Sequence, residues 1–238
     1  MRVTEGEPEM TIAEEQTRHT ESVVQSAASA WPFMGLIMSP AVDRAIAIVA
    51  ILPFSYLEYV RFREGLVNIP RAAAFAATLL LIVTMVVRRP PVRVTPNPWF
   101  WLLAFVVTYG SFGLAMFAQR GVVIAPPIVT DVIALLGLGI FIYARFSLGR
   151  NIGFVPAQRQ LVTSGAYAYV RHPVYTGIFV TYLGLILRSY SPVNLAAVII
   201  LSGLWIIKSF IEESFLKSDP VYAEYMPRVK FRWFPRIA

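Results

Sequence analysis

Long apolar runs, separated by short polar or proline-rich breaks, dominate the chain from residue 45 onward. Runs of this kind are typical of membrane-spanning helices, because a helix needs roughly 20 apolar residues to cross the hydrocarbon core of a bilayer. The pattern therefore predicts an all-α fold, a polytopic helical membrane protein with about six transmembrane helices. The predicted spans are 45–60, 69–87, 99–118, 128–146, 173–187 and 193–210.

The breaks between these runs carry signals that end or start helices. The second run stops at residues 88–91, Arg-Arg-Pro-Pro, and the fourth is entered through Pro126 and Pro127. Residues 188–192 are so few that the last two spans are predicted to form a tight helical hairpin. Pro53 predicts a kink within the first span.

Three segments follow from this pattern. Residues 1–40 form a polar N-terminal tail with an interfacial end, and the Glu-, Thr- and Ser-rich composition of the first thirty predicts disorder or weak helicity. Residues 41–146 hold the first four transmembrane helices. Residues 147–238 hold a polar stretch, the helical hairpin and a mixed polar and aromatic C-terminal tail, in which an amphipathic segment is expected.

Composition and charge support a membrane protein. The chain is 57% hydrophobic and only 15% charged, where a soluble domain carries roughly 25% charged residues. The net charge is +7, but the basic residues flank apolar spans, so orientation in a bilayer explains them better than nucleic-acid binding. A cytoplasmic N-terminus puts 16 Lys and Arg on the inside and 5 on the outside. We therefore expect both termini and the polar stretch to be cytoplasmic.

Some classes of site are excluded by residues that the chain lacks or nearly lacks. It has no cysteine, which rules out disulfides, thiolate metal sites and a cysteine nucleophile. With two histidines, His19 and His172, no metal site is expected.

The first candidate constellation lies in front of the fifth span. Pro173 suits the first position of a helix, with His172 at its cap and Gly165 in a turn upstream. Unpaired backbone N–H groups at that helix start, beside Arg171, predict an anion site. The alternative interpretation is an ordinary interfacial helix start within an aromatic belt. Nearby tyrosines offer flat faces to an adenine ring or a sulfonium cation: Tyr167, Tyr169 and Tyr175.

The second constellation is Trp205, Lys208 and Glu212, whose spacings of three and four place them on one helix face. Lys208 is a candidate partner for an acceptor's carboxylate, and Glu212 for an ammonium or the ribose hydroxyls of a cofactor. Glu213 points about a hundred degrees away and is expected to be structural. The alternative is a plain Lys–Glu pair where a helix leaves the membrane.

Three ordered motifs carry a family resemblance. They are LVTSGAYAYVRHPVYTG at 161–177, EESFL at 212–216 and YAEYMPRVKFRWFP at 222–235. Together they resemble the isoprenylcysteine carboxyl methyltransferases, in a wider group with bacterial relatives and phospholipid methyltransferases. The resemblance covers about the C-terminal ninety residues. It implies a bacterial-type enzyme of the inner membrane that uses S-adenosylmethionine without a Rossmann domain and holds it between the pre-helix loop and the tail.

The resemblance also assigns site residues. Lys208 stands where the prenylcysteine enzymes have a substrate-binding Arg, so Lys208 and Glu212 become the candidate catalytic residues. Arg159 stands where eukaryotic members have His, and Lys230 where many members have Pro. The implied cofactor contacts are Arg159, Gln160, Leu161, Val162, Tyr167, His172, Pro173, Val174, Tyr175 and Glu212.

We therefore expect a membrane methyltransferase that acts on a lipophilic or small anionic acceptor, a carboxylate in preference. Its expected partners are the lipid bilayer and that methyl acceptor, without nucleic acid or metal. Phospholipid N-methyl transfer and thiol S-methyl transfer remain open for the same site. Two other classes also remain open, an NADPH-dependent enzyme resembling the sterol reductases and a non-enzymatic membrane protein.

Overall fold

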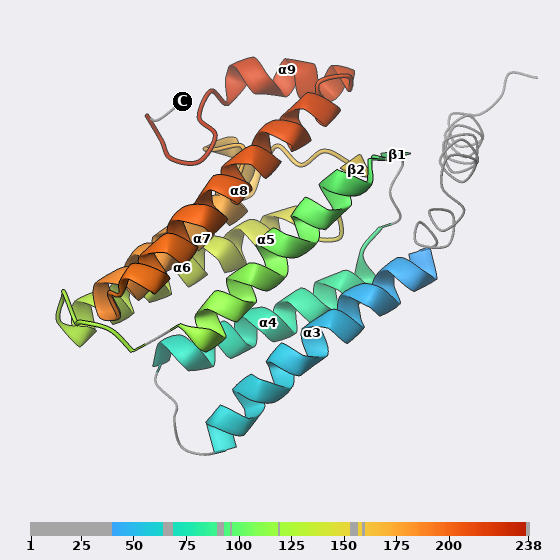
Figure 1. Cartoon of the computed structure of the whole chain (residues 1–238). Helices are drawn as coiled ribbons and strands as arrows, with labels where there is room; N and C mark the ends of the chain where they lie inside the picture. Colours follow the sequence, from blue (N-terminus) through green and yellow to red (C-terminus); the bar gives the residue numbers. More distant parts are fainter. Residues whose placement is uncertain are drawn as a thin grey trace, which may run out of the picture.

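The computed structural model describes residues 40–63, 69–89, 93–95, 97–118, 120–152, 157–158 and 160–236. The expectations for the N-terminal tail and for Arg159 lie outside these residues. Helices make up most of the described chain, and the all-α prediction is confirmed (Figure 1). The elements are α3 (Pro40–Arg63), α4 (Ile69–Val87), β1 (Arg93–Val94), α5 (Pro98–Phe117), α6 (Pro127–Leu148), β2 (Ala157–Gln158), η1 (Gly165–Ala168), α7 (Pro173–Arg188), α8 (Pro192–Leu216) and α9 (Pro220–Arg228).

Each predicted span coincides with one helix, from α3 to α8. Proline opens α5, α6, α7 and α8, where its missing N–H costs nothing. Asn97 caps α5 by accepting from Trp99 N at 3.0 Å, and Ser191 caps α8 by accepting from Asn194 N at 3.0 Å. Only three residues separate α7 from α8, which confirms the predicted hairpin.

The predicted end of the last span is too early. That prediction stopped near residue 210, whereas α8 continues to Leu216 and carries both Glu212 and Glu213 as helical residues. The helix continues because each carboxylate has a cationic partner, Lys208 for Glu212 and Arg171 for Glu213. Charges that end an apolar run in the sequence therefore do not end the helix.

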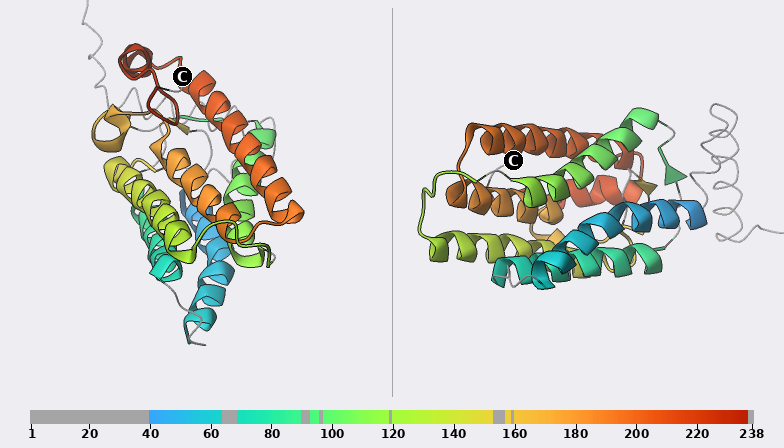
Figure 2. Two further views of the ribbon diagram at one scale, coloured as in Figure 1. Left: turned by 90° about the vertical axis from the view of Figure 1, so that its left-hand side faces the viewer. Right: turned by 60° about the horizontal axis from the view of Figure 1, so that its bottom comes forward.

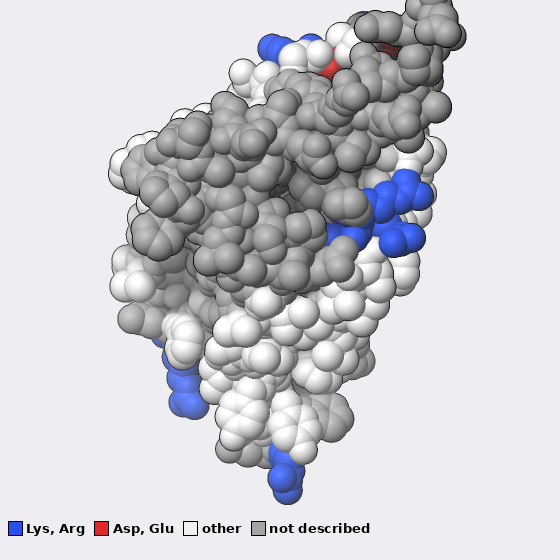
Figure 3. Space-filling model, turned by 90° about the vertical axis from the view of Figure 1, so that its right-hand side faces the viewer, with Lys and Arg blue, Asp and Glu red and all other residues white. Residues whose placement is uncertain are grey.

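Among the described residues, three helices are long and apolar enough to cross a membrane: Pro98–Ala115 within α5, α6 and α8. The outward faces of the helices carry large apolar side chains such as Leu136 and Ile199, which are 59% and 62% exposed. In Figure 3 a band without charged side chains separates groups of Lys and Arg on the described surface. Exposed apolar side chains between charged ends are compatible with a lipid bilayer around the helices.

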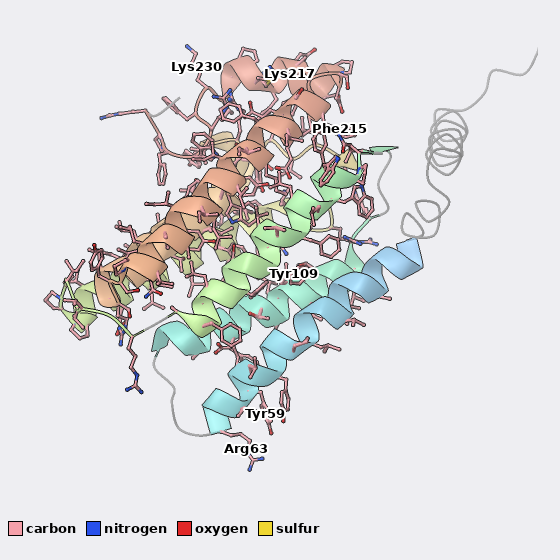
Figure 4. The ribbon with its side chains drawn as sticks, in the orientation of Figure 1. Tyr59, Arg63, Tyr109, Phe215, Lys217 and Lys230 are labelled. Atoms are coloured by element: carbon pink, nitrogen blue, oxygen red, sulfur yellow. The ribbon has the colours of Figure 1, made fainter. Side chains whose placement is uncertain are left out.

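The helices run between two ends that differ in structure. Arg63 and Tyr59 lie at the end of α3 that is far from α9, whereas Lys217 and Lys230 lie beside α9 (Figure 4). The views of Figure 2 show the same separation from other sides. The end that carries α9 also carries the short ladder in which Arg93 pairs with Gln158 and Val94 with Ala157.

Helices α6 and α7 approach each other through two glycines. A Cβ added to Gly177 would lie 2.6 Å from Phe141 N and 2.7 Å from Gly137 O, and one added to Gly137 would lie 2.8 Å from Gly177 O. Contacts this close leave no room for a side chain on either helix. The pair fixes α7, and hence its N-terminal end, against α6.

Replacing Gly177 by alanine is therefore expected to lower the free energy of unfolding by about 1–3 kcal/mol through overpacking. The apparent melting temperature in detergent measures this effect. Gly139→Ala is the matched control, because a Cβ added to Gly139 meets no atom within 4 Å. Equal melting temperatures for the two variants would contradict the close approach.

Candidate functional site

The segment between α6 and α7 folds together with the C-terminal tail at the α9 end of the bundle (Figure 1). Arg171 N donates to Phe231 O at 2.9 Å, and His172 N donates to Arg232 O at 2.8 Å. Tyr225 of α9 donates its phenol hydrogen to Tyr167 O at 2.6 Å. The tail therefore closes over the start of α7 and holds the predicted loop residues in place.

Glu213 is the centre of a buried charge cluster that joins helix, loop and tail. Its side chain is 2% exposed and accepts from Arg171 Nε at 2.8 Å and from Arg232 Nε at 3.2 Å. His172 Nε2 lies 3.2 Å from the same carboxylate. Glu213 thus connects the two residues before α7 to Arg232 of the C-terminal tail, which fits the structural role expected for it.

Arg171 does not form the anion site predicted for it. Its guanidinium is used by Glu213 and by two tail carbonyls, Val229 O at 2.9 Å and Lys230 O at 3.3 Å. The prediction placed this guanidinium beside the backbone N–H groups at the helix start. Glu213 and the tail occupy the guanidinium, a long-range contact that the local sequence does not display.

Glu212 faces the other way and forms a triangle with Tyr175 and Lys208. Tyr175 OH donates to Glu212 Oε2 at 2.5 Å and accepts from Lys208 Nζ at 2.7 Å. Lys208 Nζ also pairs with Glu212 Oε1. An ammonium has three donors, so the described partners use two of the three.

Aromatic rings pack around this triangle. The His172 and Tyr175 rings are stacked with centroids 5.1 Å apart, and the Trp205 ring lies 4.5 Å from that of Tyr175. Lys208 Nζ lies 5.3 Å and 5.4 Å from the centroids of Tyr175 and Trp205. Such rings hold the ammonium in place by cation–π attraction and provide faces for a second cation or a planar ring.

A cavity of about 380 Å³ opens beside the triangle, and its volume is that of a small-molecule site. The structure brings nine of the eleven site residues implied by the resemblance to its wall, and Arg171 and Trp205 of the two candidate constellations line it as well. Pro173 is buried at the start of α7 and does not line the cavity. The nine are Gln160, Leu161, Val162, Tyr167, His172, Val174, Tyr175, Lys208 and Glu212.

The cavity has a polar part at the loop and an apolar part between helices. The apolar part is lined from α4 by Leu81, from α5 by Phe112, from α6 by Leu138 and from α7 by Ile178 and Leu185. At 1.5 Å per residue, Tyr175 and Leu185 are about 15 Å apart along α7. A molecule with a polar head and an apolar tail matches this shape.

Several lining residues were not predicted as site residues. Phe215, labelled in Figure 4, is near the end of α8, and Tyr222 and Tyr225 are on α9. Arg145 and Asn151 come from the end of α6 and the turn that follows it. For Arg145 the sequence offers one signal, a charge near the end of an otherwise apolar span.

The tyrosines at the polar end remain protonated phenols. Burial raises the pKa of Tyr167 well above its usual range, and the nearby Arg145 guanidinium offsets only part of that rise. Burial likewise raises the pKa of Tyr222 and of Tyr225. These side chains therefore contribute rings and neutral hydroxyls to the wall, without charge.

No group of three or more His, Cys, Asp and Glu side chains in the described ranges could hold a metal ion. Glu212 pairs with Lys208, and Glu213 pairs with Arg171, Arg232 and His172. The described arrangement is therefore suited to a cation and to hydroxyl groups at Glu212, and to an anion at Lys208.

Comparison with known proteins finds one family model that resembles part of the chain. Residues 127–223 match the model of the family described as phospholipid methyltransferase. The match runs from α6 into α9 and covers the loop, Tyr175, Lys208 and Glu212, while α3, α4 and α5 lie outside it. No curated protein matches the chain. The match confirms the resemblance to this wider group of membrane methyltransferases.

Proposed function

From the family match of residues 127–223, we propose that the chain is an integral membrane methyltransferase that uses S-adenosylmethionine. The proposed acceptor is lipophilic or a small anion, with a carboxylate as the methylated group in preference. The proposal rests on one observation above all. A single cavity joins the residues expected to hold the cofactor to an apolar space between the helices.

The polar end of the cavity fits the cofactor in chemistry. Glu212 offers a carboxylate to the ammonium or the ribose hydroxyls, and His172 and Tyr175 offer ring faces. Gln160, Leu161 and Val162 border the same space from the loop. Arg159, also in the proposed cofactor set, extends this loop segment in sequence.

The chain's residues position the reactants instead of supplying a strong base. Bound S-adenosylmethionine supplies a methyl group on a sulfonium that is open to in-line displacement. A carboxylate acceptor is already nucleophilic, and burial among apolar side chains removes the water that would otherwise stabilise it. Lys208 orients the acceptor's carboxylate with the one N–H donor that Tyr175 and Glu212 leave unused. Tyr175 and Glu212 hold the Lys208 ammonium in place.

The acceptor's apolar tail is proposed to occupy the space between α4, α5 and α7 and to enter from the bilayer. The soluble cofactor is proposed to enter from the cytoplasmic side, where the loop and the tail meet. The cytoplasmic side is assigned from the excess of Lys and Arg there. The entry proposed for the acceptor follows from the apolar lining between the helices.

Amine methylation is the second candidate, favoured by the description of the matching family. An amine must lose a proton before or during transfer. The hydrogen-bonded pair of Tyr175 and Glu212 is the acceptor of that proton in this alternative, with an O–O distance of 2.5 Å.

The purified protein, incubated with methyl-labelled S-adenosylmethionine and a membrane extract, tests the proposal. We expect the label in a lipid-soluble product. Release of the label as methanol by mild alkali identifies an ester and hence a carboxylate acceptor, whereas alkali-stable label identifies an amine or thiol. Binding of NADPH without binding of S-adenosylhomocysteine would point to a reductase, and binding of neither would overturn the proposal.

A further inference from the structure

One buried cation in the cavity wall is not used by the site described above. Arg145, near the C-terminal end of α6, is 6% exposed and lines the cavity. Among the described residues its Nε has no hydrogen-bond partner, and its Nη2 has one long contact, 3.5 Å to Thr84 Oγ1. Its Cζ lies 5.6 Å from the centroid of the Phe141 ring.

The other buried cations of the site are compensated. Arg171 has a carboxylate and two carbonyls, and Lys208 has a carboxylate and a phenol. A buried guanidinium without such partners is costly, and the cost falls only when an anion approaches it. Arg145 therefore differs from its neighbours in having donors that the described residues leave without a strong partner.

A second polar atom in the same wall has no partner. Asn151, two residues beyond the Gly149 that ends α6, lines the cavity, and its buried Oδ1 accepts no hydrogen bond from the described residues. An unpaired acceptor and a guanidinium that line one cavity suit a ligand that carries both an ammonium or hydroxyl and an anionic group. Two orphaned polar groups in one wall point to a ligand and not to an isolated packing defect.

We infer that Arg145 is an anion-binding residue of the cavity, which holds a carboxylate or phosphate group of a bound molecule. The inference rests on the proposed function for the source of that anion, which is either the amino-acid end of the methyl donor or the head group of the acceptor. The guanidinium fork matches both kinds of oxyanion.

Stability of the ligand-free protein gives the first test. Arg145→Met removes an uncompensated buried charge and keeps an unbranched apolar side chain in place of the arginine stem, so its melting temperature is expected to equal or exceed that of the unsubstituted protein. A substantially lower melting temperature would assign Arg145 a structural role and overturn the inference. Arg188→Met is the control for loss of an arginine that is paired, since Arg188 binds Asp131 away from the cavity.

Binding gives the second test and distinguishes the two sources. If the donor supplies the anion, Arg145→Met weakens S-adenosylhomocysteine in calorimetry about tenfold or more and leaves its decarboxylated analogue unchanged. If the acceptor supplies it, S-adenosylhomocysteine binds as before. The variant then loses the thermal stabilisation given by dodecanoate or dodecyl phosphate in nanodiscs, while dodecanol acts equally on both proteins.

Arg145→Lys keeps the positive charge without the guanidinium fork. Its affinity for these probes is expected to lie between that of the unsubstituted protein and that of Arg145→Met. Unchanged binding of all these probes would overturn the inference. Failure of the unsubstituted protein to bind S-adenosylhomocysteine would instead count against the proposed function, and the amphiphile measurements would still test Arg145.

Discussion

Glu213→Ala is expected to lower the free energy of unfolding by about 3–5 kcal/mol, because it breaks a buried ion pair. The substitution leaves Arg171, 6% exposed, without its carboxylate and removes the acceptor shared by His172 and Arg232. Uncompensated buried cations are costly, so the tail should detach from the start of α7. Chemical denaturation in mixed micelles measures the loss, and hydrogen exchange at residues 229–234 reports the detachment.

Glu224→Gln is the matched control for this change. Glu224 pairs with Arg228 on the exposed side of α9, where both side chains are more than two-thirds exposed, at 74% and 71%. Surface pairs contribute about 0–1 kcal/mol, so this variant should unfold almost as the unsubstituted protein does. Similar losses of unfolding free energy in the two variants would show that the buried charge cluster around Glu213 does not stabilise the fold.

Glu212→Gln is expected to weaken binding of S-adenosylhomocysteine about ten- to a hundredfold, the largest functional effect predicted. Hydrogen bonds to a charged partner are worth about 1.5–3 kcal/mol, and the amide keeps the shape of the side chain while losing the charge. It also loses the ion pair that fixes Lys208 beside Tyr175. Calorimetry on the protein in nanodiscs measures the affinity.

Tyr175→Phe separates the two parts of this effect. It removes the phenol that donates to Glu212 and keeps the ring that stacks on His172. A smaller loss than that of Glu212→Gln is expected, because the carboxylate retains Lys208. Full affinity in Glu212→Gln would take this glutamate out of the cofactor site.

Local sequence patterns were sufficient for the helices. The predicted second span coincides with α4, and the other spans match their helices to within a few residues except at the ends of α3 and α8. Apolar runs and prolines act over one or a few turns, so neighbouring residues determine them. The last span was predicted to stop near residue 210, short of the end of α8 at Leu216, although the spacing of Lys208 and Glu212 already placed Glu212 on that helix. Arg171, which compensates Glu213, is distant in sequence.

In the candidate site, too, contacts between neighbouring residues could be predicted and contacts between distant residues could not. Lys208 and Glu212 are one turn apart, so their spacing alone predicted that they would meet. The role of Arg171 could not be predicted locally, because it depends on carbonyls of residues 229 and 230 that return from the tail. The walls from α4 and α5 were also missed, since an apolar side chain facing a cavity has the same sequence signature as one facing lipid.

The short length of α7 bears on the depth in the bilayer at which a methyl group would be transferred. Sixteen residues make a helix about 24 Å long, against about 30 Å of hydrocarbon. If its far end reaches the opposite boundary of the bilayer, His172 and Tyr175 lie below the near one, at the depth of the first acyl carbons. A lipid acceptor would then reach the site by lateral diffusion within the bilayer. The proposed water-soluble reactant, S-adenosylmethionine, would have to enter below the level of the head groups.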